Sequence, residues 1–333
     1  MTTARSPRDA RPQSAAPVSP APAAEGTTAR PGVRTDLVLL GVAIAGVSLS
    51  APLIASIAAP ALAIAFWRNA MAIGALTPLV LLRHRAELRG LGRRALLLSA
   101  CAGALLAVHF ALWLPSLRMT SVASSTALVT TTPIWTTLLL RLRGHRPPAL
   151  VWAGTGLAVL GVVILTGVDL SVSPRALAGD GLALAAGVAA AGYVLLGAEV
   201  RRTVGTVVYT YVCYLTTTVL LLVACLPAGT PLAGYSDSTW WKLAVLTVTA
   251  QLLGHGLFNR VVKGLGPSVT STAILLETPG AALIAALWLG QMPAAAAYPA
   301  LVVILAGLAL VIMADRPGKA DRPGKKVRAS RSA

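Results

Sequence analysis

The chain has 333 residues, of which 56% are hydrophobic and only 12% are charged, and its mean hydropathy is +0.75. Soluble domains carry about 25% charged residues, so this composition excludes an ordinary soluble globular protein. The net charge of +17 does not indicate nucleic-acid binding, because Lys and Arg lie between apolar runs and not in one basic domain. We therefore predict an all-α integral membrane protein.

The first predicted segment, residues 1–36, is a basic tail. It is rich in Pro, Ala, Ser and Thr and contains five Arg residues. Such a composition buries too little apolar surface to fold, and the segment lacks the apolar core of a secretory signal peptide. We expect it to be disordered. Residues 315–333 are a second basic tail.

Between the tails, apolar segments recur, each close to the 20 or so residues that a helix needs to cross a bilayer. They predict ten transmembrane helices, near 37–57, 62–82, 95–115, 120–140, 149–168, 179–199, 207–227, 240–260, 267–289 and 295–314. The short loops that are left exclude a soluble catalytic domain.

The number of Lys and Arg residues is high and low by turns in successive intervals between the predicted spans. With a cytoplasmic N-terminus, the inner intervals hold twelve and the tails another twelve, whereas the outer intervals hold only Arg118, Arg175 and Lys242. Cations near the ends of a span resist translocation. The pattern predicts a multi-pass protein of the plasma or inner membrane with both termini in the cytoplasm.

An internal repeat appears at an offset of 146 residues, where 109–166 aligns with 255–312 without a gap. The aligned pairs include His109 with His255, Pro133 with Pro279, and Gly161 with Gly307. The halves 37–168 and 169–314 would each hold five spans. Because five is odd, the two halves must be inverted relative to each other.

The sequences HFALWLPSLRMTSVASSTALVTTTPIW at 109–135 and SVTSTAILLETPGAALIAALWLGQMP at 268–293 carry a family resemblance. From 37 to 314 the chain resembles the EamA transporters of the drug/metabolite transporter superfamily. The resemblance implies two EamA repeats around a central cavity, in a carrier of the kind that often exports amino acids and other metabolites. Two positions depart from the family pattern: Thr278 separates Glu277 from Pro279, and Gln291 stands where the family often has Glu.

Two charged residues lie well inside predicted spans and away from their ends, where a centred charge costs roughly 2.5–3.5 kcal/mol on insertion scales. Glu277 lies near the middle of the ninth span, where burial favours its neutral form. It is a candidate proton or substrate site, or else a protonated carboxyl that bonds another helix. Arg68 lies in the second span. It can hold an anionic group of a substrate, pair with Glu277, or extend its head group to the interface.

Polar residues also follow one face of the eighth span, where Gln251, His255 and Asn259 are spaced by four. The matching part of the third span contains His109 and Trp113. Either His can titrate near neutrality or act as a structural hydrogen-bonding group. Both readings stay open.

In the fourth span, Thr131 and Trp135 fall on the face equivalent to that of Glu277. They are candidates to line a substrate cavity, although packing is an alternative role for the indole. Pro133 and Pro279 occupy mid-span positions, where proline removes a backbone hydrogen bond. Breaks of this kind often lie beside the binding site of a transporter.

No cofactor or metal site is predicted. The three Cys residues lie in apolar runs without metal-ligand spacing, and no nucleotide-binding motif is present. We therefore predict a secondary active transporter of a small-molecule substrate, not an enzyme, working in the lipid bilayer by alternating access with proton coupling, as a monomer or a homodimer. The alternatives are a membrane enzyme that acts on lipid-linked substrates and a membrane scaffold without transport.

Overall fold

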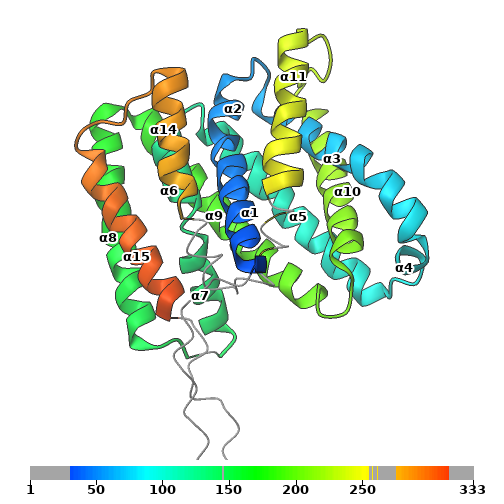
Figure 1. Cartoon of the computed structure of the whole chain (residues 1–333). Coiled ribbons are helices and arrows are strands. Elements are labelled where there is room, and N and C mark those ends of the chain that lie inside the picture. Colours follow the sequence, from blue (N-terminus) through cyan, green and yellow to red (C-terminus); the bar gives the residue numbers. More distant parts are fainter. Residues whose placement is uncertain (1–30, 145, 255–256, 258–260, 262–274, 315–333) are drawn as a thin grey trace, which may run out of the picture.

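The computed structural model describes residues 31–144, 146–254, 257, 261 and 275–314, and every regular element within them is a helix (Figure 1). The expected tails therefore lie largely outside the described residues. The helices are α1 (Pro31–Ser48), α2 (Ser50–Ser56), α3 (Ala61–Arg83), α4 (Arg85–Arg89), α5 (Arg93–Ser116), α6 (Val122–Val129), α7 (Thr132–Leu142), α8 (Ala149–Val172), α9 (Pro174–Val200), α10 (Thr206–Cys225), α11 (Asp237–Leu246), η1 (Thr247–Gly254), α14 (Glu277–Leu289) and α15 (Ala297–Ala314).

Several helix ends follow from short-range chemistry. Ser121, Ser173 and Ser236 precede α6, α9 and α11, and each side chain accepts a hydrogen bond from a backbone N–H of the first turn, as N-caps do. Gly290 ends α14 with a φ of 65°, a left-handed conformation that favours glycine. Helix α1 begins at Pro31, before the first span expected at 37, and proline is well tolerated in a first turn.

Six of the described helices are long and apolar enough to cross a membrane. They are Thr35–Ser56, Ala61–Arg83, Arg93–Ser116, Pro174–Val200, Thr206–Cys225 and Ala297–Ala314. The span expected at 120–140 is divided into α6 and α7, and those expected at 240–260 and 267–289 are described only in part. The number of ten spans stays a prediction.

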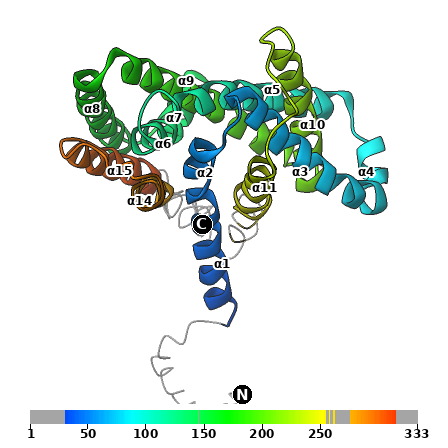
Figure 2. The same cartoon turned by 90° about the horizontal axis from the view of Figure 1, so that it is seen from above.

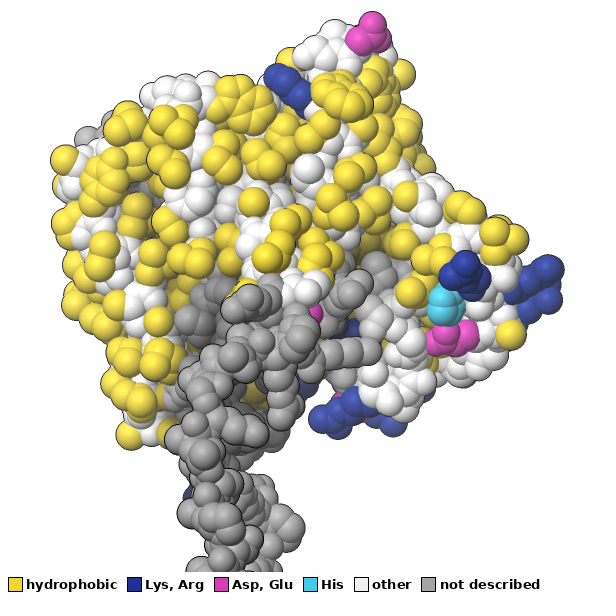
Figure 3. All heavy atoms as spheres, viewed as in Figure 1, with side chains coloured by type: hydrophobic (Ala, Val, Ile, Leu, Met, Phe, Trp, Pro, Cys, Tyr) yellow, Lys and Arg dark blue, Asp and Glu magenta, His cyan; other side chains and the backbone are white. Residues whose placement is uncertain are grey.

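The surface of the molecule is mostly apolar. Figure 3 shows hydrophobic side chains over most of one face, with the charged side chains gathered over α4 and the region beside it, and a few over α11. Leu287 is 79% exposed and Val302 is 65% exposed. An apolar surface of this extent is expected where a protein contacts lipid.

The helices form two packed groups joined by α9 (Figure 2). Helices α3, α5 and α10 pack together on one side, and α6, α8, α14 and α15 on the other, while α9 contacts α5 as well as α6, α7 and α8. The two apolar cores contain residues from both halves of the sequence. The expected repeats are therefore interleaved in space and are not separate lobes.

Helices α8 and α15 pack closely at glycines. A Cβ atom at Gly161 would lie 2.8 Å from the Ile304 nitrogen, and one at Gly307 would lie 2.7 Å from the Ala158 Cβ. These two contacts exchange under the offset of 146, because 161 and 307 are equivalent positions and so are 158 and 304. They also run in opposite directions along the two helices. Antiparallel, self-complementary packing is the arrangement expected of two inverted copies.

The three cations expected in outer intervals lie together at the end of α2. Arg118 Nη2 donates to the Ile57 carbonyl at 2.5 Å, and Lys242 Nζ donates to the Ser56 carbonyl at 3.0 Å. Arg175 Nη2 donates to the Arg118 carbonyl at 3.1 Å. Cations are favoured at the C-terminus of a helix, where backbone carbonyls lack partners within the helix. These three residues therefore hold one end of the bundle together.

Replacing Arg118 with Gln is expected to lower the thermal unfolding midpoint of the purified protein. The loss should correspond to about 1 kcal/mol, because a charge-assisted bond to the carbonyls after α2 is removed. Arg85→Gln, on the exposed helix α4, is the control and should leave the midpoint unchanged. Equal midpoints for Arg118→Gln and the wild type would contradict this role.

Candidate functional site

A buried polar network surrounds Arg68 of α3. The side chain is 2% exposed, and its Nε donates to Gln251 Oε1 at 2.7 Å. The Gln251 amide donates to Asn69 Oδ1 at 2.9 Å, and the Asn69 amide donates to the Ala65 carbonyl at 2.8 Å. The Asn69 amide thus orients the Gln251 amide, and the Gln251 amide orients the Arg68 side chain. Arg68 is held inside the bundle and does not extend to the interface.

Gln251 is presented by η1, a π-helical segment that continues α11. Thr247 begins this segment, and its hydroxyl donates to the Leu243 carbonyl at 2.9 Å and lies 3.5 Å from the Arg68 carbonyl. The predicted face of residues spaced by four assumes an α-helix. A π-helix bonds residue i to i+5, and of the three predicted residues only Gln251 lies within 247–254. His255 and Asn259 lie outside the described residues.

Three members of the network were missed by the sequence prediction. Asn69 follows Arg68 directly in an apolar span, and Phe110 of α5 lies under the guanidinium, with 4.5 Å from Cζ to the ring centroid. Tyr214 of α10 interacts with the Arg68 charge and with Gln251. The gap-free alignment of the repeat covers 109–166 and 255–312 and so gave no signal for Asn69 or Tyr214.

Glu277, the first residue of α14, is half-buried. Its carboxylate and the Arg68 guanidinium attract each other electrostatically. No ion pair within 4.0 Å joins the two in the part of the chain that the structure describes. The structure thus brings Glu277 toward the Arg68 network without direct pairing. Its position at a helix N-terminus suits a negative charge.

His109 and Trp113 of α5 stack on each other, with 5.7 Å between the ring centroids and 29° between the planes. His109 Nδ1 donates to the Ala186 carbonyl of α9 at 3.0 Å, which is the structural hydrogen-bonding role weighed above. Trp113 is 5% exposed. The two predicted residues therefore lie together, on the helix that also carries Phe110.

Pro133 and Pro279, the predicted helix-break residues, both lie in the first turn of a helix. Pro133 is the second residue of α7, directly after the turn at 130–131, and Pro279 is the third residue of α14, after a turn at 275–276. The hydroxyls of Thr130 and Thr278 are 3.2 Å apart. The turn before α7 and the first turn of α14 are thus in contact inside the bundle.

Thr131 lies in the turn between α6 and α7, and Trp135 is the fourth residue of α7. The Thr131 hydroxyl donates to the Leu128 carbonyl at 2.6 Å and accepts from Trp135 Nε1 at 3.1 Å. Both side chains therefore satisfy groups at the interrupted helix. No hydrogen bond joins them to the Arg68 network among the described residues.

Gln291 has a structural role at its described position. Its side-chain oxygen accepts a hydrogen bond from the Val122 backbone N–H at 3.4 Å, at the start of α6. The amide oxygen thereby satisfies one of the backbone donors that a helix N-terminus leaves unpaired. A neutral amide is sufficient for this contact.

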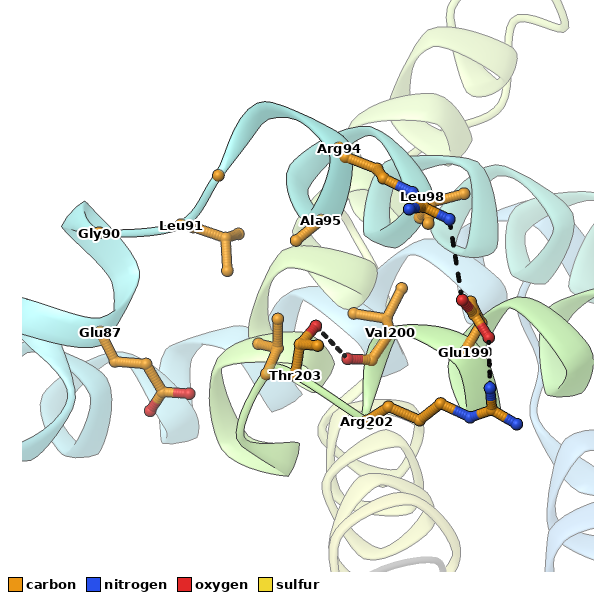
Figure 4. Close-up of a pocket in the computed structure, with 12 residues that line it drawn as sticks. Glu87, Gly90, Leu91, Arg94, Ala95, Leu98, Glu199, Val200, Arg202 and Thr203 are labelled. Carbon is orange, nitrogen blue, oxygen red and sulfur yellow. Dashed lines mark hydrogen bonds and ion pairs between the residues drawn. The ribbon is translucent and has the colours of Figure 1, made fainter.

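A cavity of about 450 Å³ opens elsewhere, between α4, the start of α5 and the turn from α9 to α10 (Figure 4). Its charged lining is paired internally: Glu199 lies 3.3 Å from Arg202 and 3.8 Å from Arg94, and Glu87 accepts from the Gly205 backbone N–H at 2.6 Å. None of the predicted site residues lines it. We assign this cluster to holding α4 against the α9–α10 turn.

Residues 36–167 and 177–313 each match the EamA-like transporter family. No curated protein matches. A solved structure described as "Crystal structure of protein" resembles 85% of this chain and 99% of its own, with a TM-score of 0.57 and 17% sequence identity. At that identity the likeness shows the fold alone.

Proposed function

The chain belongs to the EamA-like transporter family of the drug/metabolite transporter superfamily, and from this premise we propose that it is a secondary active transporter that exports small metabolites. The family matches cover most of the chain and establish a multi-pass membrane transporter. Amino-acid-like or amphipathic substrates, alternating access, proton coupling and a cell-membrane location with both termini in the cytoplasm are the finer parts of the proposal. So are the two repeats, 37–168 and 169–314, and the ten spans.

The contact between the turn that separates α6 from α7 and the start of α14 carries the proposal. Thr130 and Thr278 meet at 3.2 Å where α6 gives way to α7 and where α14 begins. Interrupted helices expose backbone groups that a membrane interior cannot satisfy, so they are tolerated where protein or a water-filled site surrounds them. In carriers built from inverted repeats, such interruptions flank the substrate site.

The interleaved packing supports a particular form of alternating access. Because α9 contacts helices of both packed groups, we expect the groups to rotate relative to each other and not the repeats as whole bodies. The site around Arg68 and Glu277 would then open toward one side of the membrane at a time. Glu277 would carry the proton, since its charge has no direct ion-pair partner among the described residues.

The competing functions fit these observations less well. An enzyme for lipid-linked substrates needs polar groups gathered at one interface, whereas the Arg68 network is buried between helices. A scaffold needs no buried charge at all, and such a charge in a membrane protein is expensive. Transport gives both charged residues a role.

The proposal is tested by efflux from proteoliposomes. Vesicles that contain the purified full-length protein are loaded with a mixture of the proteinogenic amino acids, and the external solution is analysed by mass spectrometry over time. We expect selective release of a subset of the mixture, faster than from protein-free vesicles. Release equal to that from protein-free vesicles for every compound would contradict the proposed substrates.

A further inference from the structure

We propose that Arg68 receives a carboxylate group of the transported compound, so that the cargo is a compound with one carboxylate in the site. This inference rests on the proposed function and narrows its substrate class. Its basis is an incompletely partnered cation inside the bundle, together with a second buried donor on the helix that Arg68 faces.

The positive charge of Arg68 has only neutral hydrogen-bonding partners in the described residues. Nε is bonded to the amide oxygen of Gln251, and the guanidinium face rests on the Phe110 ring. An arginine stays protonated at physiological pH, so burial cannot remove the charge as it can for other groups. A buried ion without a paired counter-ion is unfavourable. An anion would remove this penalty.

The geometry of the guanidinium leaves donors for that anion. Nη1 of Arg68 is buried and has no hydrogen-bond partner in the described part of the chain. The chain from Gln251 to Asn69 and on to the Ala65 carbonyl uses the polar atoms that could turn toward it. The guanidinium is therefore fixed at Nε, and Nη1 is an unused donor. A charged nitrogen donor of this kind suits an oxygen of a carboxylate.

Trp113 supplies a second donor close by. Its Nε1 is buried and lacks a partner among the described residues. Trp113 follows Phe110 by three positions on α5, so the two side chains share one helix face about 4.5 Å apart along the axis. An anion over Arg68 and Phe110 would thus lie near an indole N–H as well. The aromatic surroundings favour a carboxylate on an apolar or aromatic skeleton.

Charge balance favours a carboxylate over a phosphate group. One guanidinium neutralises one negative charge, and the other described charged group that interacts with it is Glu277, which is acidic. A dianionic phosphate would leave excess negative charge beside Glu277 in a site of low dielectric constant. A monoanion leaves none once Glu277 is protonated.

The experiment introduces a carboxylate side chain beside Arg68 by substitution, so that this side chain occupies the proposed site. Gln251→Glu places an acidic group on the Arg68 Nε. We expect this variant to unfold at a higher temperature than the wild type without ligand, because Arg68 gains a counter-ion.

The probes are benzoate, 3-phenylpropionate and L-phenylalanine, each with its amide, and the readout is the shift of the thermal unfolding midpoint in detergent. At least one carboxylate, and none of the amides, should stabilise the wild type, and this shift should disappear in Gln251→Glu.

Two further variants test whether the carboxylate-induced shift depends on the site around Arg68. Gln291→Glu, which adds the same group at the start of α6, should retain the carboxylate shift. Arg68→Lys keeps the charge without the fork and should bind carboxylates about tenfold more weakly. Equal stabilisation of the wild type by carboxylates and amides, an unchanged shift in Gln251→Glu, or no shift with any carboxylate would overturn the inference.

The proposed carboxylate site and the proposed transport function can be contradicted separately. Carboxylate binding that depends on Arg68, without release from vesicles, would leave the site standing and remove the transport proposal. Transport that Gln251→Glu leaves unchanged would keep the transporter and remove the carboxylate site.

Discussion

Replacing Glu277 with Gln should abolish the acceleration of transport by a proton gradient. Gln keeps the size and hydrogen-bonding capacity of the protonated carboxyl group but cannot release a proton. Cargo release from proteoliposomes should therefore proceed at one rate with and without an imposed pH gradient. In the wild type we expect the gradient to change this rate by about tenfold, the size of a coupling energy near 1.4 kcal/mol.

The matched control is Glu199→Gln, an exposed carboxylate that pairs with Arg202 at 3.3 Å. Ion pairs at an exposed surface contribute little to stability, so this variant should respond to the gradient as the wild type does. Exchange of cargo without a gradient should persist in Glu277→Gln, which shows that the variant is folded. An identical response of Glu277→Gln and the wild type would remove the proton-coupling proposal.

The sign of this coupling follows from the neighbouring charges. Arg68 is the described charged group that interacts with Glu277, and Tyr214 also faces Arg68. A carboxylate bound at Arg68 would repel an ionised Glu277 and so favour its protonation. Linkage is reciprocal, and a lower pH should therefore strengthen carboxylate binding to the wild type. Glu277→Gln should bind with an affinity that does not depend on pH in this way.

Sequence patterns that act over short distances predicted much of the architecture. The apolar runs gave helices close to their expected positions, and the family resemblance is confirmed by the matches at 36–167 and 177–313. Pro133 lies beside the turn between α6 and α7, as expected of a residue that acts on its own helix. The contact between Thr130 and Thr278 was not predicted, since it depends on how two helices cross.

The candidate site was predictable only in part. Arg68 and Gln251 were both proposed, yet their bond joins residues 183 positions apart, and no local pattern indicates such a pairing. The roles of Asn69 and Phe110 depend on the same tertiary contact. The π-helical geometry of 247–254 was not predicted either. Glu277 remains a prediction whose test is functional.

Replacing Gly307 with Ala should strongly destabilise the fold. The added Cβ would lie 2.7 Å from the Gly154 carbonyl oxygen and against the backbone nitrogen of Ala158. Backbone atoms of α8 cannot move aside as a flexible side chain can, so α8 and α15 must separate. Overpacking of this kind typically costs about 1–3 kcal/mol. We expect a lower thermal unfolding midpoint of the purified protein in the same detergent.

The control is Gly156→Ala, which is expected to change the unfolding midpoint in the opposite direction or not at all. Gly156 also lies in α8, but a Cβ atom there would meet nothing within 4 Å. Alanine is a better helix former than glycine by roughly 0.5–1 kcal/mol, so Gly156→Ala should leave the midpoint unchanged or raise it. If Gly307→Ala also raised the midpoint, intrinsic helix propensity would outweigh the contact, and α8 and α15 could not approach as closely as described. The exchange of equivalent contacts, and with it the structural support for two inverted copies, would then be lost.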